Sequence, residues 1–203
     1  MRGIALLLLA VSWAATAQTP IGARTILVVG DSISAAYGIQ REQGWVALLE
    51  ARVAKLATPH QVVNASISGD TTGGALARLP RALEIHKPDV VVIEVGGNDA
   101  LRGYPINRIE HNLDAMVTLA KDAGADVLLL GMEIPPNYGA RYTQAFRNVF
   151  SEVAARADAP LVPFLLDGVA TDAKLMQADG IHPTAAAQPR LLENVWPTLK
   201  SLL

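Results

Sequence analysis

The chain has 203 residues, of which 51% are hydrophobic, and it contains no cysteine. A chain of this length can bury a full hydrophobic core, so packing rather than disulfide bonds must hold it together. The formal net charge is −2, and the Lys and Arg residues are scattered among acidic ones. Without a basic stripe to neutralise phosphates, the sequence argues against nucleic acid as a partner.

The first seventeen residues have the pattern of a cleaved secretory signal peptide. Arg2 precedes an apolar run over residues 4–11, and the small-residue end Ala15-Thr16-Ala17 precedes Gln18. The apolar run is too short for a membrane-spanning helix, and no later apolar run is long enough to span. We therefore expect export to the periplasm or the medium, with residues 1–17 removed and residues 18–203 forming a single domain.

Apolar stretches rich in β-branched residues alternate with segments of helical periodicity along the rest of the chain. The predicted strands cover residues 25–29, 61–64, 90–95, 127–130 and 161–165. The predicted helices fall within residues 45–56, 76–83, 109–119, 147–158 and 184–202, and Pro189 and Pro197 should break or bend the last one. This alternation predicts one doubly wound α/β domain, with helices on both faces of a parallel sheet.

Polar residues and turn-forming residues follow the predicted strands at the points where each strand ends. Ser32 follows the first strand, Gly69 the second, Asn98 the third, and Ile134 and Pro135 the fourth. In a doubly wound sheet the ligand lies beyond the carboxyl ends of the strands. We therefore expect these residues, distant in sequence, to share one rim of the sheet.

Three residues on this chain match the requirements of nucleophilic catalysis. A serine hydroxyl needs an imidazole to take its proton, and the imidazole needs a carboxylate to hold its tautomer. Ser32 in Gly30-Asp31-Ser32, with Asp179 and His182 in Asp179-Gly180-Ile181-His182, supplies these groups. The three-residue step from Asp179 to His182 suits a single turn, so the pattern predicts Ser32 as nucleophile, His182 as base and Asp179 as its orienting acid.

Acyl transfer also needs donors for the negative charge that develops on the carbonyl oxygen. The backbone N–H groups of Ser32 and Gly69 and the side-chain amide of Asn98 could converge as this oxyanion hole. Each residue has a simpler explanation: Asp179 could cap the last helix, Gly69 could serve a turn, and Asn98 or Asp99 could cap a helix. The occurrence of Asp179 and His182 together with Gly-Asp-Ser after the first strand and Gly-Gly-Asn-Asp after the third favours catalysis.

Other kinds of site are poorly supported. The phosphate-binding lysine motif and the dinucleotide-binding glycine fingerprint are missing. His60, His86 and His111 lack the spacing of metal ligands, and Trp45 is better explained as a core residue. The predicted chemistry requires no metal or cofactor.

Four motifs, those of Ser32, Gly69, Asn98 and the Asp179–His182 turn, together resemble the signature blocks of the SGNH, or GDSL-type, hydrolases. The resemblance covers about residues 24–202. The resemblance is strongest to the periplasmic thioesterase, lysophospholipase and arylesterase branch of that family. The matching stretches are Asn64-Ala65-Ser66-Ile67-Ser68-Gly69-Asp70-Thr71-Thr72, Gly96-Gly97-Asn98-Asp99-Ala100-Leu101-Arg102-Gly103, Ile134-Pro135-Pro136-Asn137-Tyr138-Gly139 and Asp179-Gly180-Ile181-His182-Pro183.

This resemblance implies a flavodoxin-like three-layer α/β/α sandwich, with a five-stranded parallel sheet and the site roles given above. It also implies a mobile loop over residues 100–105 and a substrate wall near Ile134 and Pro135. We expect the substrate to be a small-molecule ester or thioester, including lysophospholipids, with Leu101, Tyr104, Ile134 and Pro135 in contact with it. We also expect a monomer. A carbohydrate acetylesterase of the same family and a non-catalytic flavodoxin-like binding module remain the alternatives.

Overall fold

The computed structural model describes residues 22–203, so the predicted signal peptide lies outside the described residues. Its five strands form one parallel sheet in the order β2-β1-β3-β4-β5. The strands are β1 (Thr25–Gly30), β2 (Gln61–Asn64), β3 (Val90–Glu94), β4 (Asp126–Leu130) and β5 (Leu161–Val162). The chain first winds outward from β1 to β2 and then returns to place β3 on the other side of β1. The carboxyl ends of β1 and β3 therefore flank the point where a ligand is expected in this topology.

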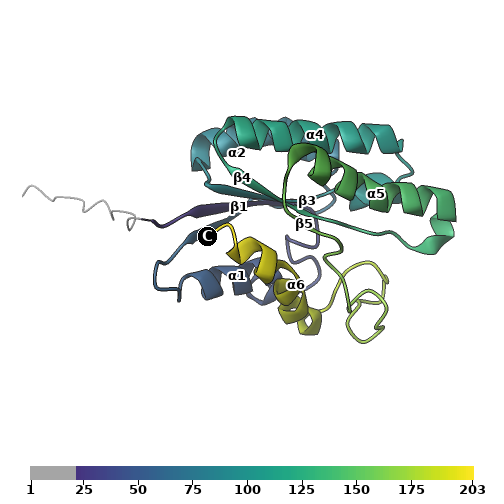
Figure 1. Cartoon of the computed structure of the whole chain (residues 1–203). Helices are drawn as coiled ribbons and strands as arrows, with labels where there is room; N and C mark the ends of the chain where they lie inside the picture. Colours follow the sequence, from purple (N-terminus) through teal and green to yellow (C-terminus); the bar gives the residue numbers. More distant parts are fainter. Residues whose placement is uncertain (1–21) are drawn as a thin grey trace, which may run out of the picture.

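Helices cover both faces of the sheet, which confirms the predicted three-layer α/β/α class. Figure 1 shows α2, α4 and α5 on one face, and α1 and α6 on the other. Their bounds are α1 (Trp45–Val53), α2 (Thr72–His86), α4 (Ile106–Asp122), α5 (Ala140–Ala157) and α6 (Gln188–Lys200), with short helices η1 (Arg41–Gln43), α3 (Gly97–Leu101), η2 (Pro136–Tyr138) and η3 (Ala185–Ala187). Within residues 22–203, no helix combines the length and apolarity needed to cross a bilayer.

The sheet forms the centre of the hydrophobic core because its middle strands are covered on both faces. All five residues of β3 are buried, and in β1 only Thr25 is partly exposed. Such strands appear as continuous apolar runs rather than as alternating patterns. Glu94 is the exception, because it places a carboxyl group at the buried end of β3. The central strands therefore form a rigid base under the loops that follow them.

Two predicted boundaries are wrong, each for a local reason. α5 begins at Ala140 rather than near Arg147. The sequence pattern misses its first turns because they are largely exposed and the buried stripe starts only at Phe146. β5 ends at Val162 rather than Leu165. Pro163 follows Val162 directly and has no N–H to continue the ladder.

The last helix is not interrupted at its prolines, although the sequence predicted a break or bend there. Pro189 lies in the first turn of α6, where a missing backbone N–H costs little, and the helix also continues past Pro197 to Lys200. The short helix α3 is a further difference from the expected pattern. It includes Ala100 and Leu101, which the family resemblance assigns to a loop, so only residues 102–105 connect α3 to α4.

Candidate active site

Ser32 lies in a tight turn immediately after β1, and its backbone is fixed on several sides. The Asp31 carbonyl accepts a hydrogen bond from the Ala35 N–H at 2.9 Å, and the Ser32 carbonyl accepts one from the Tyr37 N–H at 3.0 Å. A Cβ atom at Gly30 would lie only 2.6 Å from Ser34 Cβ. Glycine at this position thus allows the turn to close, and Ser32 is held with 9% of its surface exposed.

The segment carrying Asp179 and His182 is a closed loop in front of α6. The Gln177 N–H donates to the His182 carbonyl at 2.7 Å, and the Gly180 N–H donates to the Gln177 carbonyl at 2.9 Å. Gly180 has φ +67°, a left-handed conformation that glycine adopts without strain. Asp179 Oδ1 accepts hydrogen bonds from the backbone N–H groups of Ile181 at 2.9 Å and His182 at 3.0 Å. Asp179 therefore organises this loop and does not cap α6.

The structure joins Ser32, His182 and Asp179 in one chain of hydrogen bonds. His182 Nε2 lies 2.9 Å from Ser32 Oγ, and His182 Nδ1 lies 2.7 Å from Asp179 Oδ2. Because Asp179 Oδ2 can only accept while it is ionised, Nδ1 carries the proton and Nε2 is free to accept one from Ser32. This is the geometry that activates a serine hydroxyl as a nucleophile.

The electrostatics of Asp179 favour its ionised form. Burial alone would raise its pKa, but hydrogen bonds from the backbone and ring of His182 and from the Ile181 N–H lower the pKa to about 2. The Tyr37 ring packs against the His182 ring with their centroids 4.5 Å apart. Tyr37 thus covers one face of the imidazole, while Asp179 orients its edge.

Besides the Ser32 N–H, the predicted oxyanion donors lie on segments that follow β2 and β3. Gly69 has φ +79°, and a Cβ atom there would meet no other atom within 4 Å, so the space beside its backbone is open. Arg102, just after α3, donates to the Gly69 carbonyl at 3.2 Å. This contact ties the two segments together.

Asn98 does not cap a helix, because the residue at the N-cap of α3 is Gly96. Its Nδ2 instead donates to Asp31 Oδ2 at 3.1 Å. An amide nitrogen has two hydrogens, so one can bind Asp31 while the other stays available for an oxyanion. Asp99 is buried and contacts a different helix. Its carboxylate accepts hydrogen bonds from the backbone N and Oγ1 of Thr72, at the start of α2, at 2.8 and 2.6 Å.

Asp31 is a site residue that the sequence pattern did not single out. Its Oδ1 accepts a hydrogen bond from the Ile33 N–H at 3.1 Å, and its Oδ2 accepts the one from Asn98. Burial raises the pKa of Asp31 to about 6, although the hydrogen bonds from Ile33 and Asn98 and the nearby His182 oppose the shift. Its position in the Gly-Asp-Ser turn is visible in the sequence, but its partner is not.

The four residues predicted to contact substrate differ in how accessible they are. Leu101 and Tyr104 are half-buried, Pro135 is exposed, and Ile134 is packed into the core with 8% exposure. The Tyr104 carbonyl accepts a hydrogen bond from Tyr142 Oη at 2.7 Å. An open cavity of about 560 Å³ lies beside this contact, lined by Ile106, Tyr138, Gly139, Ala140, Arg141, Tyr142 and Ala145.

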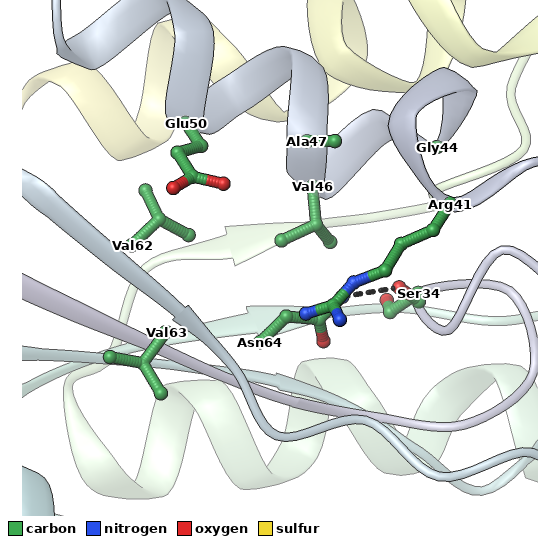
Figure 2. A pocket seen from close by; sticks show the side chains of 9 residues that line it. All are labelled: Ser34, Arg41, Gly44, Val46, Ala47, Glu50, Val62, Val63 and Asn64. Carbon is green, nitrogen blue, oxygen red and sulfur yellow. Dashed lines mark hydrogen bonds between the residues drawn. The ribbon is translucent and has the colours of Figure 1, made fainter.

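A second cavity, of about 270 Å³, lies behind the turn that carries Ser32, between α1 and β2. Figure 2 shows Arg41 and Glu50 reaching into it from separate segments. Asn64 and Ser34 also line it, and Asn64 Nδ2 donates a hydrogen bond to the Ser34 carbonyl at 2.8 Å. Neither cavity is lined by Ser32, Asp179 or His182. The triad residues therefore belong to neither hollow, although Ser34 brings the smaller one within two residues of Ser32.

Two residues set aside on sequence grounds have structural partners. His60 Nδ1 accepts a hydrogen bond from the Arg24 N–H at 3.0 Å. Burial and, to a smaller extent, the positive charge of Arg24 lower the pKa of His60. Trp45 is fully buried, as expected of a core residue, but its Nε1 also donates to Ser34 Oγ at 3.2 Å.

Comparison with known proteins agrees with this arrangement. Esterase TesA of Pseudomonas aeruginosa is 60% identical over 181 residues, covering 89% of this chain and 90% of the relative. Thioesterase 1/protease 1/lysophospholipase L1 of Escherichia coli strain K12 is 41% identical, covering 89% of this chain and 86% of the relative. The crystal structure of TesA superimposes with a TM-score of 0.87 at 59% identity, covering 89% of this chain and all of that one. Residues 28–189 match the GDSL-like Lipase/Acylhydrolase family, to which this chain therefore belongs.

Proposed function

We propose that this ester hydrolase acts through an acyl-enzyme formed on Ser32. The supporting observation is the continuous hydrogen-bond chain from Ser32 Oγ through His182 to Asp179, with distances of 2.9 and 2.7 Å. Ser32 Oγ attacks the substrate carbonyl carbon as His182 Nε2 takes its proton. His182 then passes that proton to the leaving alcohol or thiol as the C–O or C–S bond breaks.

The second half of the reaction uses the same groups. His182 removes a proton from water, the resulting hydroxide attacks the acyl carbon, and the bond to Ser32 Oγ breaks with return of the proton. In both tetrahedral intermediates, the Ser32 and Gly69 N–H groups and Asn98 Nδ2 donate to the oxyanion. Asn98 is pre-oriented by Asp31, so this donor is in place before charge develops.

We propose esters and thioesters with an apolar acyl or aryl part as the substrate class, lysophospholipids among them. The exposed and half-buried side chains of Leu101, Tyr104 and Pro135 offer apolar surface at the strand-end rim. The names of the esterase and of the thioesterase and lysophospholipase relatives support this class. Aryl esters, acyl-CoAs, lysophospholipids and acetylated sugars should be compared as substrates. Preference for acetylated sugars would favour a carbohydrate esterase instead.

The nucleophile is tested by labelling the active protein with a fluorophosphonate and mapping the modified peptide. We expect one adduct, on Ser32, and loss of labelling in Ser32→Ala. Label on another serine, or an active protein that resists labelling, would refute this assignment. A protein that is folded but hydrolyses none of the four substrate classes would instead favour a binding module.

We further propose that the enzyme is exported after removal of residues 1–17 and acts as a monomer. The sequence pattern of those residues supports export. Amino-terminal sequencing of protein recovered from the periplasm or medium should begin at Gln18. Light scattering should give the mass of one chain.

A further inference from the structure

A buried carboxyl group lies beneath the nucleophile turn, and the proposed acyl-transfer steps do not use it. Glu94 ends β3 and is 0% exposed. Its Oε2 accepts a hydrogen bond from Ser34 Oγ at 2.6 Å and lies 3.3 Å from the backbone N of Asp31. Its Oε1 is buried without a hydrogen-bond partner among the described residues. Such unsatisfied atoms are rare because they cost stability, so the presence of an acid here requires an explanation.

Hydrogen bonds tie the turn that carries Ser32 to β3 through Glu94 and to α1 through Trp45. Trp45 Nε1, on α1, donates to Ser34 Oγ at 3.2 Å, so the single Ser34 hydroxyl proton is directed to Glu94. The backbone carbonyl of Glu94 also accepts the Asp31 N–H at 3.1 Å. A Cβ atom at Gly30 would lie 2.8 Å from Glu94 Oε2, which shows how closely the carboxyl group fills the space under the turn.

Two carboxyl groups therefore share this buried region, and the charge of Asp31 affects the pKa of Glu94. Burial raises the pKa of Glu94 well above its ordinary value of 4.5, and the negative charge of Asp31 raises it further, against the hydrogen bonds from Ser34 and the Asp31 N–H. The pKa of Asp31 is about 6. Close carboxyl groups in a site of low dielectric do not both ionise readily. Ionisation of Asp31 therefore opposes ionisation of Glu94, which is the more deeply buried of the two.

We propose that Glu94 is a positioning residue for ester hydrolysis, which holds the Ser32 turn through Ser34 and the Asp31 backbone. This inference rests on the proposed function. Glu94 Oε2 supports the turn by accepting from Ser34 Oγ, while the Asp31 carboxylate accepts from Asn98 Nδ2. A leucine would fill similar space but could not accept the Ser34 hydrogen bond, which explains why an acid ends an otherwise apolar strand.

The test compares Glu94→Gln with Glu94→Leu by the rate of fluorophosphonate labelling at Ser32 and by kcat and KM for an aryl ester at neutral pH. Glutamine is uncharged and keeps an oxygen acceptor, so we expect labelling and kcat within about threefold of the wild type. Leucine releases Ser34, so we expect both to fall at least about tenfold with KM little changed, because a small misplacement of the nucleophile slows the chemical step.

Val90→Ala is the matched control, because Val90 lies on the same face of β3 at its far end and is fully buried. It should lower the melting temperature without slowing the labelling of Ser32. Ser34→Ala combined with Glu94→Leu should slow labelling by less than the product of the two single effects, because both changes break the hydrogen bond between Ser34 and Glu94. The infrared spectrum should show the carbonyl stretch of one protonated carboxyl group, which Glu94→Gln removes.

Several results would overturn the proposal. One is that Ser32 in Glu94→Leu is labelled at the wild-type rate. Another is that Val90→Ala slows labelling as much as Glu94→Leu does when both variants lose the same melting temperature. Glu94→Gln could fail as badly as Glu94→Leu, or the infrared spectrum could lack the protonated carboxyl group. A wild-type enzyme that is active but unlabelled at Ser32 would refute the proposed function instead, so the two failures are distinguishable.

Discussion

Asn98 Nδ2 donates a hydrogen bond to Asp31 Oδ2 at 3.1 Å, which joins the segment after β3 to the nucleophile turn after β1. These two strands are neighbours in the sheet and flank the point where the winding reverses. The carboxylate fixes one hydrogen of the amide and so aims the other. The proposed oxyanion donor is therefore oriented by a residue adjacent to the proposed nucleophile, Ser32.

Asn98→Ala should lower kcat by roughly 10²- to 10³-fold, because one preorganised donor to the developing oxyanion is lost. The melting temperature should change little, because Asn98 caps no helix and is only partly buried. Steady-state kinetics and thermal melting would check this together. Near-normal kcat with a much lower melting temperature would show that Asn98 is structural.

Asp31→Asn should lower activity, because Asp31 accepts from two donors with its two oxygens. An amide has only one oxygen, so either the Ile33 N–H or Asn98 would face an NH2 group. We expect kcat to fall by up to about 10³-fold, the cost of a lost oxyanion donor. An unchanged kcat would contradict the orienting role.

The same substitution should change how stability depends on pH. The pKa of Asp31 is about 6 in the folded protein against an ordinary value of 3.8, so the folded state holds this proton more tightly. The stability that this tighter proton binding provides is fully present below about pH 4 and is lost as the pH rises through 6. The free energy of unfolding of Asp31→Asn, relative to wild type, should therefore increase by up to about 3 kcal/mol between pH 4 and pH 7. Denaturant unfolding at both values would show it, and a constant difference would argue against the raised pKa.

Asp179→Asn should remove most activity by selecting the wrong tautomer of His182. Asp179 Oδ1 already accepts two backbone N–H groups, so an asparagine would place its NH2 group against His182 Nδ1. Nε2 would then carry the proton and could not accept one from Ser32, a loss of about 10⁴-fold in kcat. Unchanged activity would show that another group orients His182.

The acid side of the wild-type pH profile should reflect Asp31 and not Asp179. The pKa of Asp179 is about 2, so Asp179 remains ionised between pH 4 and pH 8. The pKa of Asp31 is about 6, and protonation removes the carboxylate that orients Asn98, so kcat should fall as the pH drops through 6. This step should be missing from the kcat profile of Asp31→Asn, and its persistence there would assign it to another group.

Leu101→Ala and Ile134→Ala should behave differently, although the sequence predicts substrate contact for both residues. Half-buried Leu101 should contribute about 1 to 3 kcal/mol to longer acyl chains, so KM should rise more for those esters than for acetyl esters. Ile134 is packed in the core, so its truncation should lower the free energy of unfolding by about 2 to 5 kcal/mol. Chain-length-independent kinetics for Leu101→Ala would remove it from the substrate site.

The sequence by itself determined the sheet, the rim and the residues that meet there. Continuous apolar runs identify strands buried on both faces, and parallel strands place their carboxyl ends at one edge, so the amino-acid pattern alone groups Ser32, Gly69 and Asn98. The three-residue step from Asp179 to His182 adds the remaining turn on chemical grounds. Local chemistry is enough because each group lies in its own turn motif. Helix and strand ends are less predictable, since the exposed first turns of α5 have no buried stripe and Pro163 shortens β5.

Only the tertiary structure decided which buried polar groups face one another. Asp31 accepts a hydrogen bond from Asn98, and Glu94 accepts one from Ser34. Both contacts form because β1 and β3 are neighbours in a register that pairs Gly30 with Glu94. The burial of Ile134 likewise depends on how its loop packs. Such partnerships depend on distances of a few ångströms between segments far apart in the sequence, and the charge states of Asp31 and Glu94 follow from that proximity and from the exclusion of water.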